Sequence, residues 1–310
     1  MKNINQRILK YAAKVGLSVE KDFQHFDIKF FEAYDFLPDM AMHFSSFTVK
    51  NNFTRTTSTS AIINSIGFLF YNIVEDTITS RKTRRTVDTP YVRIFPFAIP
   101  QQIHFSKNKQ VTHIAISIST DYLKTLLQED AAHFQYFFDS ANNFLIEEIM
   151  TDDILRTVND IVKKEEPAVL KGYYYRVKAL ELLLHLFDSL RKREKPAHQK
   201  ISDHDIKAIY QVRDKISSSI DKPSSITALT KIAGMNEHKL RGLFTQVFGM
   251  GIYDYYQHLR MKEAARLIRD EKLSVSAAGY QVGFENLSHF SRVFEKHIGK
   301  KPKKYSSEVR

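Results

Sequence analysis

The chain has 310 residues, with 46 Lys and Arg against 35 Asp and Glu, and a formal net charge of +11. This length exceeds one typical domain, so we expect two. The chain has no cysteine, which excludes disulfides, thiolate metal sites and cysteine nucleophiles. The amino terminus lacks the apolar segment of a signal peptide, and the most apolar stretch, residues 61–74, is too interrupted to span a bilayer. These features predict a soluble cytoplasmic protein that does not enter a membrane.

The first part of the chain, from about residue 25 to 120, is rich in β-branched and aromatic residues in short runs. Ile114, Ile116 and Ile118 occupy alternate positions, which is the periodicity of a strand with one buried face. The segment 91–100 contains two prolines that cannot donate to a ladder, so we expect it at the edge of a sheet. Many short strands without intervening helices favour a β-sandwich or a small barrel.

Helical periodicity begins at residue 120 and predicts helices over residues 121–127, 131–148, 152–164 and 173–190. In the last of these, apolar residues recur at intervals of four and three. The stripe consists of Tyr173, Val177, Leu180, Leu184 and Phe187. A narrow stripe of this kind packs on another helix, either within its own domain or as the seam of a homodimer. In the second case Val177, Leu180, Leu184 and Phe187 are the seam candidates.

A polar segment with a proline, residues 191–200, separates two periodic regions. We interpret it as the linker between a domain at 1–195 and a domain at 196–310. Residues 201–310 hold 19 Lys and Arg against 12 Asp and Glu, a net charge of +7, and are per residue about three times as basic as the rest. This excess of positive charge favours a polyanionic partner. Nearly all of this region has helical periodicity, beginning with a helix over 203–219 that Ser202 caps.

Two similar pairs of short helices follow, joined by a longer helix over 253–269. In the first pair, Ser225 caps a short helix that ends at Gly234. Glycine tolerates the left-handed backbone that a helix end needs. Asn236 then caps the second helix of the pair, residues 237–247.

In the second pair, Ser274 caps a helix over 275–281, and a turn that contains Gly283 follows. Asn286 caps the next helix, residues 287–296. One helical hairpin is a weak signal, but two in tandem, each with a cap, a glycine turn and a buried aromatic residue, are far more specific. They predict two helix-turn-helix units, in which the second helix of each pair recognises DNA.

Particular residues recur at characteristic spacing over about residues 203–305, a third of the chain. They are Ile232–Asn236, Leu240–Phe244, Phe248, Gly249, Tyr255, Leu259, Arg260, Ala264, Arg266, Leu267, Val282–Phe294, Gly299, Pro302 and Tyr305. This pattern resembles the AraC/XylS family of bacterial transcription regulators. The resemblance implies an α+β chain. A β-rich, cupin-like sensor or dimerisation domain with a helical extension would precede an all-α domain with two helix-turn-helix units.

The resemblance also implies which side chains face DNA. The positions matching base contacts are His238, Arg241 and Gly242 in the first recognition helix and Leu287, Ser288 and Arg292 in the second. Arg241 and Arg292 are the strongest candidates, because a guanidinium bonds both acceptors of a guanine edge in the major groove. The alternative is that they touch only phosphates or solvent. Expected phosphate contacts are Lys239, Thr245, Lys296, Lys300, Lys303 and Lys304, although the basic tail can equally be a solvated end.

Two positions depart from the family pattern. Gly242 stands where many relatives carry a long polar residue, so we expect the first recognition helix to read fewer bases. Ala278 and Gly279 replace a bulky apolar residue followed by alanine. We expect Gly279 to loosen the packing of the second unit and to weaken its helix by about 1 kcal/mol.

The expected function is a sequence-specific regulator that binds promoter DNA, an activator by resemblance and a partner of RNA polymerase by resemblance. A small-molecule effector or dimerisation through the front domain would control it. The effector site is not identified: the aromatic runs at 68–71 and 134–138 either line a pocket or form a core.

The alternatives are a regulator controlled by a partner without a ligand, a cupin-like metalloenzyme, and an architectural nucleic-acid-binding protein. The closely spaced His-x-His pair of cupin metalloenzymes is absent around His43, His104 and His113, and no phosphate-binding glycine loop is present. We therefore expect no metal, no cofactor and no enzymatic activity.

Overall fold

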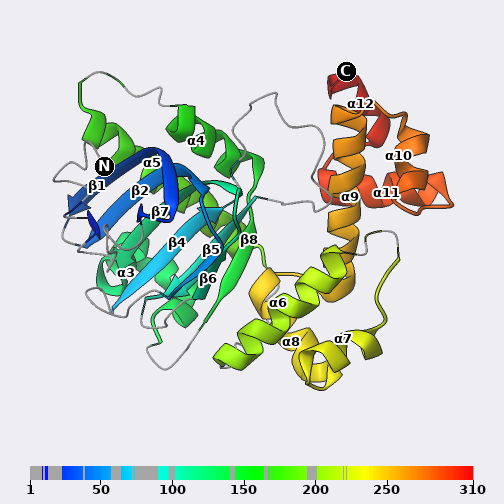
Figure 1. The fold of residues 1–310 in the computed structure, drawn as a ribbon, viewed down its shortest axis with the longest axis horizontal. Coiled ribbons are helices and arrows are strands. Elements are labelled where there is room, and N and C mark those ends of the chain that lie inside the picture. The colour runs from blue at the N-terminus through cyan, green and yellow to red at the C-terminus, as the bar shows by residue number, and fades with distance from the viewer. Residues whose placement is uncertain are drawn as a thin grey trace. The chain divides into compact units, whose positions relative to one another are not determined.

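The computed structural model describes residues 9, 11–12, 23–37, 39–56, 64–71, 73, 90–97, 102–139, 144–163, 167, 169–193, 201–218, 220 and 222–309. The described residues up to Arg193 form one compact unit and those from Ile201 onward form another, which we call the first and the second unit (Figure 1). The first unit contains the strands and the second is helical. The α+β class is therefore confirmed. None of the helices in this described part is long and apolar enough to cross a membrane.

The first unit is built on a six-stranded sheet in the order β1–β2–β7–β4–β5–β8, in which neighbouring strands are antiparallel. Its strands are β1 (Phe26–Leu37), β2 (Met40–Val49), β4 (Ser65–Tyr71), β5 (Tyr91–Pro96), β7 (Gln110–Ser119) and β8 (Ile146–Ile149). Two further strands, β3 (Phe53–Thr56) and β6 (Gln102–Phe105), pair with each other. Because successive side chains of a strand point to opposite faces, the large sheet has two different faces.

One face of the large sheet, which we call the helix face, carries Phe44, Phe68 and Ile114. It packs in one apolar core with α3 (Thr120–Leu127), the 3-10 segment η1 (Gln128–Phe137), α4 (Asp152–Lys163) and α5 (Lys171–Arg191). Ile114, Ile116 and Ile118 are 0–1% exposed on this face, which confirms the alternation expected from the sequence. The opposite face, which we call the polar face, carries His43, Tyr71 and His113.

Two expectations about the first unit are wrong. The strand β5 is not at an edge, because β4 pairs with one side of it and β8 with the other. Its proline is tolerated because β8 pairs only with Tyr91–Ile94, so Pro96 lies beyond that ladder. The helix expected over 131–148 does not form as such. Residues 128–137 are 3-10, and residues 146–149 are the strand β8, whose pairing with β5 overrides the local helical pattern.

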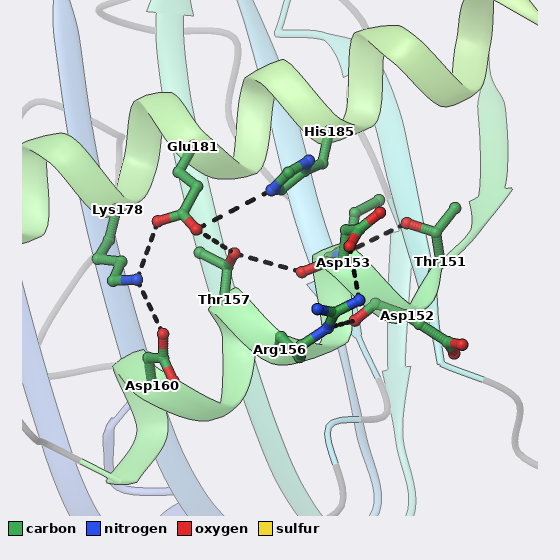
Figure 2. A network of polar contacts seen from close by, with 10 residues as sticks. Thr151, Asp152, Asp153, Arg156, Thr157, Asp160, Lys178, Glu181 and His185 are labelled. Atoms are coloured by element: carbon green, nitrogen blue, oxygen red, sulfur yellow. Dashed lines mark hydrogen bonds and ion pairs between the residues drawn. The ribbon is translucent and has the colours of Figure 1, made fainter.

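The other helices expected in the first unit are confirmed as α3, α4 and α5. Residues 194–200 of the expected linker lie outside the described residues. Figure 2 shows the polar contacts that hold α4 against α5. The Nζ atom of Lys178 lies 2.8 Å from Asp160 and 2.9 Å from Glu181, which also accepts a hydrogen bond from Thr157 at 3.0 Å. Burial disfavours the charge of Lys178, but the bonds to both carboxylates outweigh it and raise its pKa.

The second unit consists of α6 (Asp203–Ser217), α7 (Ile226–Ala233), α8 (Glu237–Phe248), α9 (Ile252–Asp270), α10 (Val275–Gln281), α11 (Leu287–Ile298) and α12 (Pro302–Val309). It contains two apolar clusters. The first joins α6, α7 and α8 to the first half of α9, as far as Leu259. The second joins the rest of α9, from Met261, to α10, α11 and α12. The long helix α9 therefore supports both helix pairs.

Candidate nucleic-acid interface

The first helix pair, α7 and α8, is capped as expected. Oγ of Ser225 accepts the amide of Ala228 at 3.2 Å, and Oδ1 of Asn236 accepts the amide of Lys239 at 2.8 Å. Between the helices, Gly234 has a φ of +62°, a backbone conformation that residues with a Cβ rarely adopt. Ser225 therefore sets where α7 begins, Gly234 where it ends and Asn236 where α8 begins.

The second pair, α10 and α11, repeats the arrangement. Oγ of Ser274 accepts the amide of Ala277 at 3.1 Å, and Oδ1 of Asn286 accepts the amide of His289 at 2.9 Å. Gly283 in the turn has a φ of +82°. The caps and glycine turns expected from the sequence are confirmed in both pairs.

The helix α8 buries one side and exposes the other. Its buried apolar side chains are Leu240, Leu243, Phe244, Val247 and Phe248. On the outer side His238 and Arg241 are exposed, while Gly242 is half-buried. Nε of Arg241 donates to Glu237 one turn earlier at 2.7 Å. Both partners of this pair are about half exposed, so it contributes little and leaves the guanidinium available to another acceptor.

The helix α11 has the same division. Phe290 and Phe294 are fully buried, whereas Ser288 and Arg292 are exposed. Arg292 has no hydrogen bond or ion pair with another described residue in the structure. Leu287, also expected to contact bases, is half-buried and packs against the second apolar cluster. Of the expected base contacts in this helix, Ser288 and Arg292 are therefore the more accessible.

The side chains expected to contact phosphates are at least partly accessible. Lys296, Lys300, Lys303 and Lys304 are exposed, and Thr245 is half-buried. Nζ of Lys296 lies 2.8 Å from Asp254, and Lys300 is paired with Glu308. Ion pairs between exposed groups contribute only about 0–1 kcal/mol, so exchanging such a carboxylate for a phosphate costs little.

Lys239 has a structural partner that the sequence did not indicate. Its Nζ lies 2.7 Å from the buried carboxylate of Asp205, which also accepts bonds from the amide and the hydroxyl of Ser202 at the start of α6. Burial raises the pKa of Asp205, but the bonds from Lys239 and Ser202 outweigh it and hold this pKa below its ordinary value. A phosphate contact by Lys239 would compete with this buried carboxylate.

Arg260 belongs to the family pattern, but nothing in the sequence assigned it a role. It is buried in α9, where its Nε donates to the carbonyl of Val282 at 2.8 Å. Its guanidinium also lies 3.9 Å from the centre of the Phe284 ring. Both partners are in the turn between α10 and α11, so Arg260 fastens that turn to α9.

The expectation that Gly279 loosens the second pair is wrong. A Cβ at this position would lie 3.1 Å from Cδ2 of Leu287 and 3.2 Å from Cδ1 of Phe290. These distances are closer than most Cβ contacts, so glycine allows α11 to approach α10 closely. The side chains of α11 occupy the space that a larger residue would need.

The apolar stripe of α5 is divided between surface and core. Tyr173, Val177 and Leu184 are exposed, at 66%, 46% and 67%, while Leu180 is partly buried against the core. Phe187 is buried, and its ring packs on Phe134 with centroids 4.9 Å apart. Phe187 is therefore wrong as a seam candidate, because its side chain serves the core of its own unit. The exposed members remain candidates.

The histidines named in the sequence do not form a metal cluster within the described residues, where no group of three or more His, Asp or Glu side chains could hold a metal ion. His43 and His113 are hydrogen-bonded to each other. The side chain of His104 lies outside the described residues.

Residues 229–308 match a protein family described as a helix-turn-helix domain. Over 95 residues the chain is 32% identical to the HTH-type transcriptional regulator GlxA of Rhizobium meliloti, an alignment that covers 31% of this chain and 29% of that protein. Over 138 residues it is 25% identical to the arabinose operon regulatory protein of Escherichia coli. That alignment covers 44% of this chain and 46% of the relative. Among solved structures, a probable AraC family transcriptional regulator from Rhodopseudomonas palustris aligns with 27% identity and a TM-score of 0.31, covering 34% of this chain and 98% of that one.

The chain thus spans less than half the length of these two curated relatives. The family match begins within α7 and extends into α12, so it includes both asparagine caps and both glycine turns. Residues 229–308 of this chain therefore match a helix-turn-helix domain family, and the same region is similar to transcription regulators, among them the arabinose operon regulatory protein.

Proposed function

We propose that the chain is a sequence-specific transcription regulator whose second unit, within a domain at 196–310, binds duplex promoter DNA. The observation that carries this proposal is the repetition of one helix pair, with the same caps and glycine turn, in a region that matches a helix-turn-helix family. We assign α8 and α11 as recognition helices of two helix-turn-helix units. Recognition helices of this kind enter major-groove segments about 34 Å apart on one side of the duplex.

The charge and exposure of the second unit support this assignment. Its sequence carries a net charge of +7 over residues 201–310, which favours a polyanion. His238 and Ser288 stand two residues after the capping asparagines of their helices, and both are exposed. Arg241 and Arg292 are exposed one turn further along. Base contacts by these residues supply sequence preference, whereas the surrounding lysines supply affinity that depends on salt.

The test is DNA binding by the full chain with both Arg241→Ala and Arg292→Ala. A preferred site is first selected from random duplexes with the wild-type protein, and affinities are then measured by fluorescence anisotropy. Each lost base contact is expected to cost about 1–3 kcal/mol and to relax the preference at that base.

A matched control is Arg156→Ala in the first unit, an exposed arginine that is also paired with a carboxylate on its own helix. It should leave both affinity and preference unchanged. Unaltered discrimination by the double variant contradicts the base contacts. Failure to enrich any site over random DNA instead favours the architectural alternative.

For the first unit, within a domain at 1–195, we propose a control function. A cupin-like domain that binds a small effector, or that joins two chains through the exposed side of α5, would set the activity of the DNA-binding domain. Both curated relatives described above are regulators by name. We propose activation of transcription, in contact with RNA polymerase in the cytoplasm. Control by a partner without an effector is the alternative.

A further inference from the structure

Three polar side chains follow one side of the long helix α9. Tyr253, Gln257 and Arg260 are four and three residues apart, so they are neighbours on the helix surface. Gln257 and Arg260 are buried, at 4% and 7% exposed, whereas Tyr253 is 60% exposed. We call these three residues the polar line. It begins inside the second unit and ends at its surface.

The hydrogen bonds of the polar line have one direction. Nη1 of Arg260 lies 3.2 Å from Oε1 of Gln257, and Nε2 of Gln257 lies 2.6 Å from the hydroxyl oxygen of Tyr253. A guanidinium only donates, so the amide oxygen of Gln257 must face it, and the amide nitrogen must face Tyr253. That nitrogen also only donates, so the oxygen of Tyr253 accepts. The hydrogen of this hydroxyl is therefore left for an acceptor outside the polar line.

The positive charge at the inner end of the polar line has no carboxylate partner among the described residues. The other contacts of Arg260 are a hydrogen bond to the carbonyl of Val282 and the ring faces of Tyr256 and Phe284, at 5.2 and 3.9 Å. Burial lowers the pKa of Arg260, but an arginine stays charged in a protein. Hydrogen bonds in series polarise one another, so this charge makes the hydroxyl of Tyr253 a stronger donor.

The outer end of the polar line lies near the end of α11. Asp254, the residue after Tyr253, forms an ion pair with Nζ of Lys296 at 2.8 Å. One turn further along α9, the ring of His258 lies 5.7 Å from that of His297. Lys296 and His297 are in the last turn of α11. Two independent contacts therefore place the start of α9 beside the carboxyl-terminal end of the proposed recognition helix.

The length of α11 bears on what this end would meet in a complex with DNA. Helix α11 has 12 residues and is therefore about 18 Å long, whereas the major groove is about 12 Å wide. A recognition helix contacts base edges near its amino-terminal end, where Ser288 and Arg292 lie. In the proposed complex the other end of α11 lies beside the phosphates that line the groove, together with the start of α9.

We infer that the hydroxyl of Tyr253 donates a hydrogen bond to a backbone phosphate of bound duplex DNA, beside the phosphate contact expected of Lys296. In this arrangement Gln257 is a positioning residue that orients the hydroxyl, and the charge of Arg260 strengthens it as a donor. The contact reads no base, so it adds affinity for every duplex sequence. It lies outside both helix pairs. The identity of the ligand as DNA rests on the proposed function.

The test measures DNA binding of the full chain by fluorescence anisotropy. The probes are a duplex selected with the wild-type protein and a random duplex of equal length. Tyr253→Phe keeps the ring and removes the hydroxyl, so it should weaken binding to both probes roughly tenfold. The hydroxyl carries no charge, so the slope of log affinity against log salt should stay the same. Lys296→Gln removes a charge and should reduce that slope by about 1.

Two further variants separate the polar line from exposure alone. Tyr280→Phe is the matched control, because Tyr280 of α10 is 58% exposed and receives no hydrogen bond from Gln257 or Arg260. It should leave the affinity unchanged. Gln257→Leu removes the group that orients the hydroxyl and should weaken binding. Added to Tyr253→Phe it should have no further effect, which a purely structural role would not produce. Tyr253→Phe and Tyr280→Phe decide the test if Gln257→Leu does not fold.

The contacted phosphate can be located with neutral methylphosphonates placed one at a time along the selected duplex. At one position the substitution should weaken binding of the wild-type protein and leave that of Tyr253→Phe unchanged, because both changes remove the same hydrogen bond. At the other positions the two proteins should lose affinity equally.

The inference is overturned if Tyr253→Phe and Tyr280→Phe bind alike, or if every methylphosphonate affects the wild type and Tyr253→Phe equally. A wild type that selects a site while Tyr253→Phe binds like it removes only this inference. A wild type without sequence preference, whose binding Tyr253→Phe still weakens, removes only the proposed sequence-specific function. A chain that binds no duplex removes both.

Discussion

Arg260 illustrates how a single side chain can join two elements of the second unit. It combines a hydrogen bond to a backbone carbonyl with contact to an aromatic ring, and both partners belong to the turn before α11. A guanidinium in this place supplies a donor that no apolar side chain can replace. The position of α11, the proposed recognition helix, therefore depends on a residue that is buried in α9.

We predict that Arg260→Met destabilises the second unit by about 1–3 kcal/mol, because the carbonyl of Val282 loses its donor while its surroundings stay apolar. The measurement is urea denaturation followed by circular dichroism. Arg241→Ala in α8 is the control, since its exposed side chain makes a surface ion pair with Glu237. It should change stability by no more than about 0.5 kcal/mol. Equal effects of the two variants would contradict the role of Arg260.

At the scale of elements, glycines with different surroundings have different functions. In α10, Gly279 is where Leu287 and Phe290 of α11 approach most closely. In α5, Gly172 is in the first turn, where an added Cβ would meet no atom within 4 Å in the described structure. One glycine is required by packing and the other is not.

We predict opposite signs for substitutions at these two glycines. Gly279→Val should destabilise the second unit by about 1–3 kcal/mol, because the added atoms overlap with α11. Gly172→Ala should stabilise the first unit by about 0.4–1 kcal/mol, because alanine restricts the unfolded chain and favours the helix. Thermal unfolding measures both. A stabilising Gly279→Val would show that α11 can move away without cost, which contradicts the close packing.

At the scale of the whole molecule, the exposed apolar side of α5 bears on assembly. Val169 and Leu170, just before the helix, are exposed together with Tyr173, Val177 and Leu184. Several apolar side chains exposed on one helix and the residues before it are a common site of association. It supports the proposed homodimer, although Phe187 is not part of it.

We predict that the wild-type chain is a dimer and that Leu184→Glu shifts its mass toward the monomer in light scattering. A charge within an apolar seam is desolvated without a partner, which disfavours association. Leu126→Glu on α3 is the control, because Leu126 is exposed but lies outside the stripe. A monomeric wild-type protein, or a dimer that Leu184→Glu does not affect, contradicts the seam.

Several features of this protein follow from the sequence alone. Ser225, Asn236, Ser274 and Asn286 cap helices by bonding to amides three residues away, and Gly234 ends a helix by its own backbone freedom. These are interactions within a few residues, so a local pattern is sufficient to predict them. The alternation of Ile114, Ile116 and Ile118 is local in the same sense. The two helix pairs, and with them the family, could therefore be predicted without a structure.

Other features depend on residues far apart in the chain, and only the tertiary structure decided them. Residues 146–149 are a strand because β5, more than fifty residues earlier, pairs with them. Gly279 of α10 is tightly packed because α11 approaches it closely. Lys239 of α8 forms an ion pair with Asp205 of α6. Phe31, His43, His113, Tyr71 and Tyr91 come from five different strands, yet their rings lie in one row on the polar face of the large sheet. Such contacts are determined by how the elements pack, and the spacing of residues along the sequence does not predict them.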